Sequence, residues 1–134
     1  MCQLCNWDDK SPEEKKDIIS LETLYCYNCP MLSEIPPELV NLIYLDCSNG
    51  PLISSIPSYS LVNLKTLYCS GCPLLVEIPP GLINLRELYC HNCPLLAEIP
   101  SELVNLERLY CSECPLITEI PPELVTLKTL RCYN

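Results

Sequence analysis

The sequence predicts an α/β-type repeat solenoid, in which short turns of chain stack along one axis and share one core. The first observation is a set of cysteines spaced 21 residues apart, with one step of 22 between Cys47 and Cys69. A fixed period in this range is typical of stacked repeats. The set comprises Cys5, Cys26, Cys47, Cys69, Cys90, Cys111 and Cys132.

The second observation is the alternation within each period, shown by the unit 85–105, LRELYCHNCPLLAEIPSELVN. Leu88 and Cys90 alternate with Tyr89, which is the two-residue period of a half-buried strand. Pro94 lacks an N–H and ends the strand. One unit is too short to bury its apolar side alone, so we expect one short strand per unit in a parallel sheet.

The third observation is that the second half of the unit is apolar at intervals and is turned by proline. Leu96 and Ile99 are expected to point back inside, and Pro100 is expected to turn the chain. Leu103 and Val104 are expected to close the unit before the next leucine.

The chain divides into a cap over residues 1–20 and repeats over residues 21–134. In the cap, Ser11 and Glu14, with a proline after the serine, match a capping box and predict a short helix through about Ile19. A charged helix can cover the end of a stacked core. The expected repeats are 21–41, 42–63, 64–84, 85–105, 106–126 and a partial unit 127–134.

Unit 42–63 departs from the pattern. Gly50 replaces the ninth-position cysteine, Asp46 replaces the fifth-position tyrosine, and one residue is inserted around Tyr59. We expect a local bulge on the variable side and an unbroken ladder of strands. The last unit stops after its strand, at Asn134, which leads us to expect an open C-terminal end.

The repeated LxxLxCxxCxxL and the following IPxxLxxL, over about residues 18–134, resemble the leucine-rich repeat signature. Cysteine stands where the sixth-position leucine and the ninth-position asparagine of that signature usually occur. The resemblance implies a parallel sheet on the concave side, loops or short 3₁₀ turns on the convex side, and partner binding, usually of proteins, on the concave strand face. The cysteine-rich repeat sequence is most similar to repeat proteins of giant DNA viruses. That resemblance implies a viral protein located in the host cytoplasm.

Charge and composition argue against several classes of partner. The formal net charge of −9 and the pI of about 4.4 disfavour nucleic acid, which needs a basic surface. No apolar run approaches the roughly 18 residues of a membrane span. The first 20 residues lack the apolar stretch of a signal peptide, so nothing in them marks export.

The twelve cysteines follow the repeat period, which favours buried free thiols in a reducing, cytoplasmic setting. We expect no disulfide between turns, because strands about 4.8 Å apart do not match the Cβ spacing of about 3.8 Å in a disulfide. Neighbouring C-x-x-C pairs could hold zinc, but we assign no metal or cofactor to them. Cys2 with Cys5 could bind a metal or oxidise, and a disordered thiol is the favoured interpretation of Cys2.

Catalysis finds little support. His91 is the only histidine, it should be exposed, and no nucleophile is placed to use it. The protein is therefore predicted not to be an enzyme. Glutamates recur at the fourteenth position, as in Glu98, and could bind calcium or a cationic partner. We favour a solvated convex face, because a calcium ion needs six or more converging oxygens.

The strand face carries the candidate binding site. Fifth-position tyrosines should lie on adjacent strands, with charges of both signs beside them, and tyrosine and arginine are frequent at interface hot spots. The predicted site residues are Tyr68, Tyr89, Tyr110, Arg86, Arg108, His91 and Glu87. Asp46 should interrupt the tyrosines, which places the centre of the site in the C-terminal half. The alternative is that the tyrosines only stabilise the sheet by stacking.

Two functions stay open at this point. The first is a non-catalytic protein-binding module that uses the concave strand face. The second is a structural or self-assembly element that stacks through its open C-terminal end, with a possible homodimer through the strand in 127–134, since unpaired edges invite pairing. We expect no nucleic-acid and no membrane partner in either case.

Overall fold

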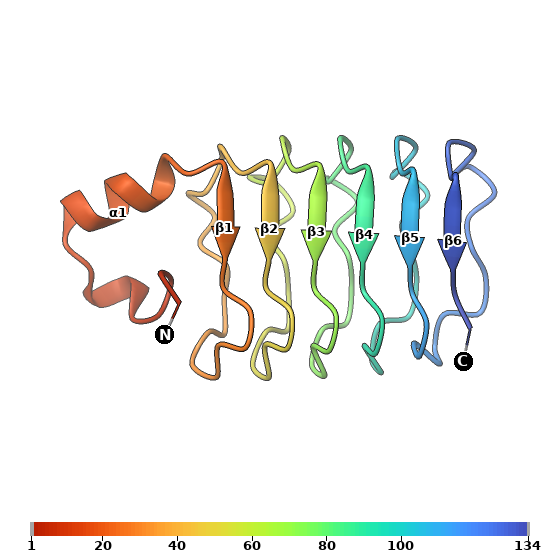
Figure 1. The fold of residues 1–134 in the computed structure, drawn as a ribbon, viewed down its shortest axis with the longest axis horizontal. Coiled ribbons are helices and arrows are strands. Elements are labelled where there is room, and N and C mark those ends of the chain that lie inside the picture. Colours follow the sequence, from red (N-terminus) through yellow and green to blue (C-terminus); the bar gives the residue numbers. More distant parts are fainter. Residues whose placement is uncertain (1, 134) are drawn as a thin grey trace.

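The computed structural model describes residues 2–133, so Met1 of the cap and Asn134 of the last unit lie outside the described residues. A 3₁₀ helix, η1 (Trp7–Asp9), and a helix, α1 (Pro12–Ile19), precede a six-stranded sheet. The strands are β1 (Thr23–Tyr25), β2 (Tyr44–Asp46), β3 (Thr66–Tyr68), β4 (Glu87–Tyr89), β5 (Arg108–Tyr110) and β6 (Thr129–Arg131). They lie side by side in chain order (Figure 1).

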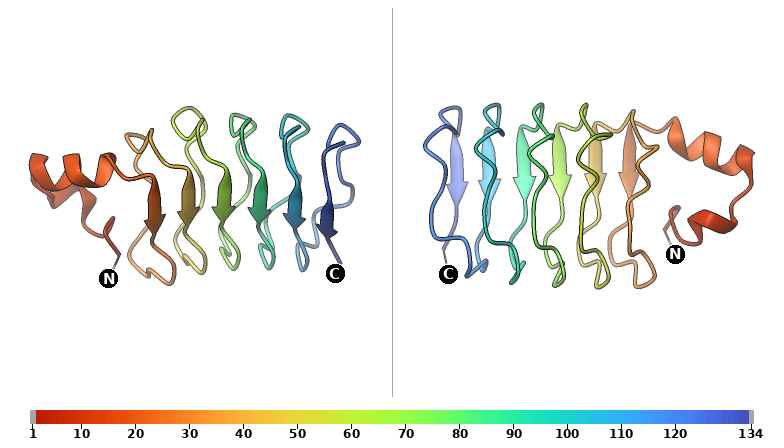
Figure 2. Two further views of the ribbon diagram at one scale, coloured as in Figure 1. Left: turned by 45° about the horizontal axis from the view of Figure 1, so that its top comes forward. Right: turned by 180° about the vertical axis from the view of Figure 1, so that it is seen from behind.

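Every strand pairs in parallel with the next one, and the fourth-position leucines align across the sheet, as Leu67, Leu88 and Leu109 do. The strands form one face of the molecule and the returning loops form the other, as the two views in Figure 2 show. This is the predicted repeat solenoid, and α1 lies beyond β1 at the N-terminal end of the row (Figure 1).

The core follows the predicted positions. In the unit 85–105, Leu88, Cys90, Cys93 and Leu96 are fully buried. Val104 was expected to close the unit together with its neighbour and instead is 45% exposed. The reason is a tight turn, in which the Val104 N–H bonds the carbonyl of Glu102 at 2.8 Å and turns the valine outward.

A left-handed residue follows each inner strand, which the sequence pattern did not reveal. The eighth position has a φ between 53° and 67° in five units, and it is occupied by Asn28, Asn49, Gly71, Asn92 and Glu113. Asparagine and glycine tolerate this conformation best. The turn keeps the ladder going past the strand, because the Asn92 N–H still reaches the Ser112 carbonyl in the next unit at 2.9 Å.

The asparagine before each repeat ties that unit to the previous one. The Asn105 side chain donates to the Ile83 carbonyl at 2.8 Å. Thr126 takes the same place in the last turn and donates to the Val104 carbonyl. Equivalent bonds come from Asn41, Asn63 and Asn84.

The cap helix forms as its sequence predicts. The Ser11 hydroxyl accepts from the Glu14 N–H at 3.2 Å, and the Ser11 N–H donates to the Glu14 carboxylate at 2.7 Å. Pro12 opens the helix, where its missing N–H costs nothing. Leu4 and Ile18 of this cap are buried against the first turn of the core. Within residues 2–133, no helix is long and apolar enough to cross a membrane.

The departures in unit 42–63 leave the strand ladder unbroken, as predicted. Strands β2 and β3 keep full register, with Leu45 opposite Leu67. The inserted residue lies in a turn over 58–60, where Tyr59 is 95% exposed. Ile53 takes the space of the missing cysteine, since its Cδ1 lies 2.6 Å from where a Cβ on Gly50 would sit.

Candidate functional site

Tyrosine rings in contact run along the strand face as one continuous row, which we call the tyrosine ladder: Tyr25, Tyr44, Tyr68, Tyr89 and Tyr110. Successive ring centroids are 5.2, 5.6, 4.1 and 4.7 Å apart. The last two pairs, which join Tyr68 to Tyr89 and Tyr89 to Tyr110, are stacked nearly flat. The Arg131 guanidinium continues the row at 5.6 Å from the Tyr110 ring. Such pairs contribute beyond the area they bury.

The predicted interruption at Asp46 is wrong. Tyr44 precedes Asp46 by two residues, and residues two apart in a strand share a face. Its ring therefore fills the gap between Tyr25 and Tyr68. The signal was present in the sequence, as a tyrosine at the third position in the one complete repeat that lacks a tyrosine at the fifth. The ladder thus spans β1 to β5, so its centre does not lie in the C-terminal half alone.

Two tyrosines of the ladder have a raised pKa. Burial, followed by the neighbouring Asp46 charge, raises the pKa of Tyr44 to about 12. Burial also raises the pKa of Tyr89, and its hydrogen bonds with Tyr68 and Glu87 raise it further. The Tyr89 hydroxyl donates to the Glu87 carboxylate at 3.1 Å. These two rings therefore stay protonated around neutral pH and can donate hydrogen bonds.

The predicted charged residues pair with one another across the strands. Arg108 reaches Glu87 at 2.7 Å, and Arg86 reaches Glu107 at 3.4 Å. Lys128 joins Glu107 from the other side at 2.8 Å, and this hydrogen bond holds the Glu107 pKa below its ordinary value. Exposed pairs of this kind add little stability. Their effect is that the charges along this border of the ladder are paired, with three cationic side chains for two carboxylates.

His91 lies at one end of the predicted site. It is exposed, and its Nδ1 is 2.8 Å from the Ser70 hydroxyl. A hollow of about 230 Å³ opens beside it, lined by His91, Tyr110, Ser112, Glu113, Arg131 and Tyr133. Ser112 and Tyr133 were not predicted here, because both come after the strand residues of their units.

The convex side differs in charge. Glu77, Glu98 and Glu119 are all exposed around an open hollow whose other lining residues include prolines. They contrast with the strand face, where carboxylates meet arginine or lysine.

Except for Cys132, the cysteines that recur with the repeat period are core residues, as predicted, but one prediction about disulfides needs correction. Burial raises the pKa of the Cys69 and Cys90 thiols well above the usual value. Cys111 and Cys132 are joined by a disulfide, so the prediction of no bond between turns is wrong for this pair. Strand pairing brings their Cα atoms to 4.6 Å, within the range of disulfides. Cys132 is also exposed on the last turn, where no further turn of the described chain holds it in the core.

Cys2 does not project freely, as was expected of a disordered thiol. It packs against the core, and its sulfur lies 3.4 Å from that of Cys5 and 3.2 Å from that of Cys29. Burial raises the pKa of Cys29, but hydrogen bonds from Cys5 and Cys2 outweigh it and lower that pKa to about 7. Cys29 was not expected in this group, because its C-x-x-C pair was assigned to the core and only Cys5 was considered as a partner of Cys2.

Comparison with known families agrees with this architecture. A family model described as Leucine Rich Repeat matches residues 20–42, 63–85, 84–106 and 105–127. These matches cover more than half of the chain, and they leave out most of the departing unit 42–63. No curated protein matches the chain.

Proposed function

Since the chain belongs to the leucine-rich repeat family, whose repeats generally serve as protein-interaction modules, we propose that it binds a protein partner on its strand face and has no catalytic role. The partner would lie along the tyrosine ladder. In this family the strand face is the concave side, so the proposal keeps the surface that the sequence indicated.

The observation that supports this surface is the unbroken ladder itself. Tyr68 and Tyr89 lie in the middle of the row and are half-buried, so each presents ring area and a hydroxyl tip to a partner. Tyrosine combines a large contact area with a polar end, and it is enriched at interface centres. The balanced ion pairs beside the row would form a polar rim.

A stacked ladder also stabilises a sheet, so stability and binding must be measured separately. A partner is first captured by crosslinking to the folded chain and identified. Tyr89→Ala should then weaken binding by about 2 kcal/mol or more, on the scale of interface hot spots. The matched control is Glu98→Ala, on the exposed convex side, which should leave affinity unchanged.

Circular dichroism must show that both variants are folded. A larger loss of affinity for Glu98→Ala than for Tyr89→Ala would reject the strand-face proposal. Equal affinity for wild type and Tyr89→Ala would reject it too, and would leave the ladder as a purely stabilising feature.

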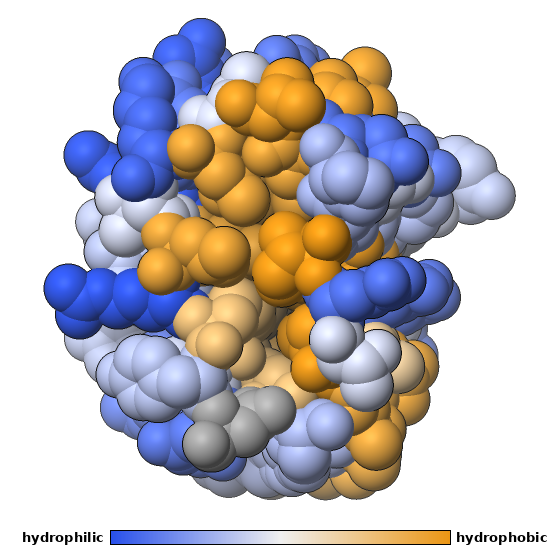
Figure 3. Space-filling view, turned by 90° about the vertical axis from the view of Figure 1, so that its right-hand side faces the viewer, coloured by the Kyte–Doolittle hydropathy of each residue, from blue (hydrophilic) through white to orange (hydrophobic). Residues whose placement is uncertain are grey.

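Self-assembly through the strand in 127–134 is the second proposal. Figure 3 looks onto the C-terminal turn and shows apolar side chains over much of that surface. Val125 is 82% exposed there and Leu130 is 49% exposed. A second copy could cover them, in the way that each inner turn covers its neighbour. Light scattering at high micromolar concentration should then give a dimer that Leu130→Lys abolishes, and a monomeric wild type would reject the proposal.

A reducing compartment, the cytoplasm, is proposed with this function. Ten of the twelve cysteines are free, and most of these are buried. The Cys111–Cys132 disulfide makes this testable, because its oxidation state in freshly lysed, alkylated cells reports the compartment. A fully reduced pair supports the cytoplasm, and a fully oxidised pair rejects it.

A further inference from the structure

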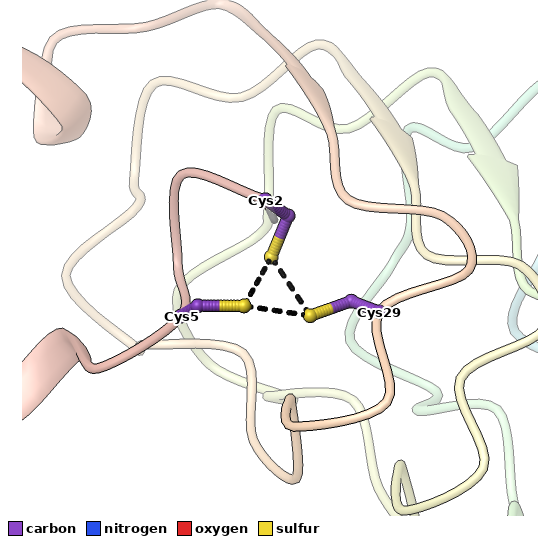
Figure 4. A group of neighbouring side chains, drawn as sticks. All are labelled: Cys2, Cys5 and Cys29. Carbon is purple, nitrogen blue, oxygen red and sulfur yellow. Dashed lines mark hydrogen bonds between the residues drawn. The ribbon is translucent and has the colours of Figure 1, made fainter.

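Three thiols meet where the cap joins the first repeat. The sulfurs of Cys2, Cys5 and Cys29 point toward one another and form a triangle with sides of 2.8, 3.2 and 3.4 Å (Figure 4). Cys5 and Cys29 are buried, and Cys2 is partly exposed. Within residues 2–133, this is the one cluster of three potential metal ligands.

The inner repeats hold the equivalent thiol mainly against the backbone, although Cys93 and Cys114 also share a side-chain hydrogen bond. The ninth-position sulfur normally donates to a carbonyl of the preceding turn, as Cys93 does to Cys69 at 3.2 Å. Cys114 donates in the same way to the Cys90 carbonyl at 3.0 Å. The partner in each case lies 24 residues earlier in the chain.

Cys5 lies the same 24 residues before Cys29. The Cys29 sulfur, however, contacts the sulfur of Cys5 and not its carbonyl. The chain at the start of the cap turns back on itself, with the Cys5 N–H bonded to the Cys2 carbonyl at 3.2 Å. This turn brings a third sulfur to the pair. The cluster therefore depends on the turn at the start of the cap and does not simply repeat the arrangement of the buried cysteines in the inner units.

We propose that Cys2, Cys5 and Cys29 form a three-thiolate site for a thiophilic metal ion, with Zn²⁺ as its occupant. Thiolate donors select Zn²⁺ and Cu⁺ over harder ions. A Zn–S bond of about 2.3 Å gives a sulfur–sulfur edge of about 3.8 Å in a tetrahedron. To reach that edge, the distance between the buried Cys5 and Cys29 sulfurs must grow by about 1 Å. The two edges to the partly exposed Cys2 need only about 0.4–0.6 Å more, which an outward movement of Cys2 supplies.

The fourth position of a tetrahedral zinc would face solvent. Cys2 and Cys29 both line a hollow of about 290 Å³, together with Tyr25, Tyr27, Asn28 and Pro30. A water molecule or an added thiolate fits that opening. On binding, each thiol releases one proton to solvent, so three thiolates and one Zn²⁺ carry a net charge of −1 and affinity rises with pH.

The site would pin the start of the chain to the first repeat. Cys2 and Cys5 belong to the cap, whereas Cys29 follows β1. A metal bound to all three would therefore fasten the cap over the end of the solenoid, and removing the metal would loosen that end first.

Cobalt titration of the full chain tests the proposal, with the thiols kept reduced by a phosphine and metals removed beforehand. We expect one equivalent of Co²⁺ per chain, with the near-ultraviolet charge-transfer band of cobalt bound to thiolates, and displacement by Zn²⁺. Cys29→Ser and Cys2→Ser should each lower the affinity at least tenfold. Cys93→Ser, at the same repeat position in an inner unit, should leave it unchanged.

The outcomes separate the alternatives. Absence of the band in the wild type, or an equal loss in Cys93→Ser, overturns the site. Binding of Cu⁺ without Zn²⁺ supports the three-thiolate site and overturns zinc as its occupant. A Cys5–Cys29 disulfide formed in air, with no metal bound by the reduced chain, overturns it in favour of a redox pair. If Cys29→Ser does not fold, Cys2→Ser decides, because Cys2 is only partly buried.

Discussion

Unit 42–63 and unit 85–105 contribute β2 and β4 to one sheet, with β3 between them, and they differ at three positions of the repeat signature. Unit 42–63 lacks the ninth-position cysteine and the fifth-position tyrosine, and it carries one extra residue. Its strand nevertheless has a fully buried leucine, Leu45, as the regular unit has Leu88. The comparison shows that the inward leucines define a turn of this solenoid. Ile53 fills the space of the missing cysteine, and Tyr44 replaces the missing tyrosine in the row of rings.

The sharpest test compares those two leucines. Leu45→Ala and Leu88→Ala should each lower the free energy of unfolding by about 2–5 kcal/mol, because both leave a cavity in the core. Urea unfolding followed by circular dichroism measures both losses. A much smaller loss for Leu45 would mean that the departing unit is loosely packed and would break the comparison.

Restoring the consensus cysteine should harm the departing unit. Gly50→Cys forces a side chain into the space that Ile53 occupies, and overpacking of this kind costs about 1–3 kcal/mol. Adding Ile53→Ala should recover part of the loss by removing the clash. If Gly50→Cys alone stabilises the chain in urea unfolding, then Ile53 is not the substitute for the missing cysteine.

Tyr44→Ala should split the ladder. It removes the ring contacts to Tyr25 and Tyr68, each worth about 0.5–1.5 kcal/mol beyond buried area. Urea unfolding should show the loss, and Tyr44→Phe, which keeps the ring, should restore most of it. A loss of similar size in Tyr44→Phe would assign the effect to the hydroxyl and not to stacking.

The smallest effect is expected at the inserted residue. Tyr59 is 95% exposed, so Tyr59→Ser should change the free energy of unfolding by no more than about 0.5 kcal/mol. Thermal unfolding of Tyr59→Ser measures the change, and the larger loss expected for Tyr44→Ala serves as the reference. A large loss at Tyr59 would show that the loop holds the unit together, contrary to the comparison.

Features that depend on local periodicity were predictable. The strand positions follow from alternation around Leu88, and the cap helix follows from Ser11 and Glu14, because both patterns act over a few residues. The place of the insertion was predictable for the same reason. Each of these features is decided within one unit of chain.

The parallel ladder and the row of fifth-position tyrosines were predicted, but several other contacts between units were not. The sequence places Tyr44 and Tyr68 in different units, and only the pairing of β2 with β3 brings their rings together, tilted by 39°. The meeting of Cys2 with Cys29 requires the cap to fold back on the first repeat. The outward side chain of Val104 depends on a turn whose hydrogen bond the apolar pattern does not encode.

The side-chain bonds of the asparagines before each repeat have a mechanical consequence. Each one reaches only the preceding unit, as Asn84 reaches Val62 and Asn105 reaches Ile83. Within the described chain each strand likewise pairs only with its neighbours in sequence. Each unit is thus stabilised only by its immediate neighbours. Unfolding should therefore begin at the terminal units, which have one neighbour each, and reach the middle units last. Amide hydrogens of β3 and β4 should exchange last, and a pulling force should release the chain one turn at a time.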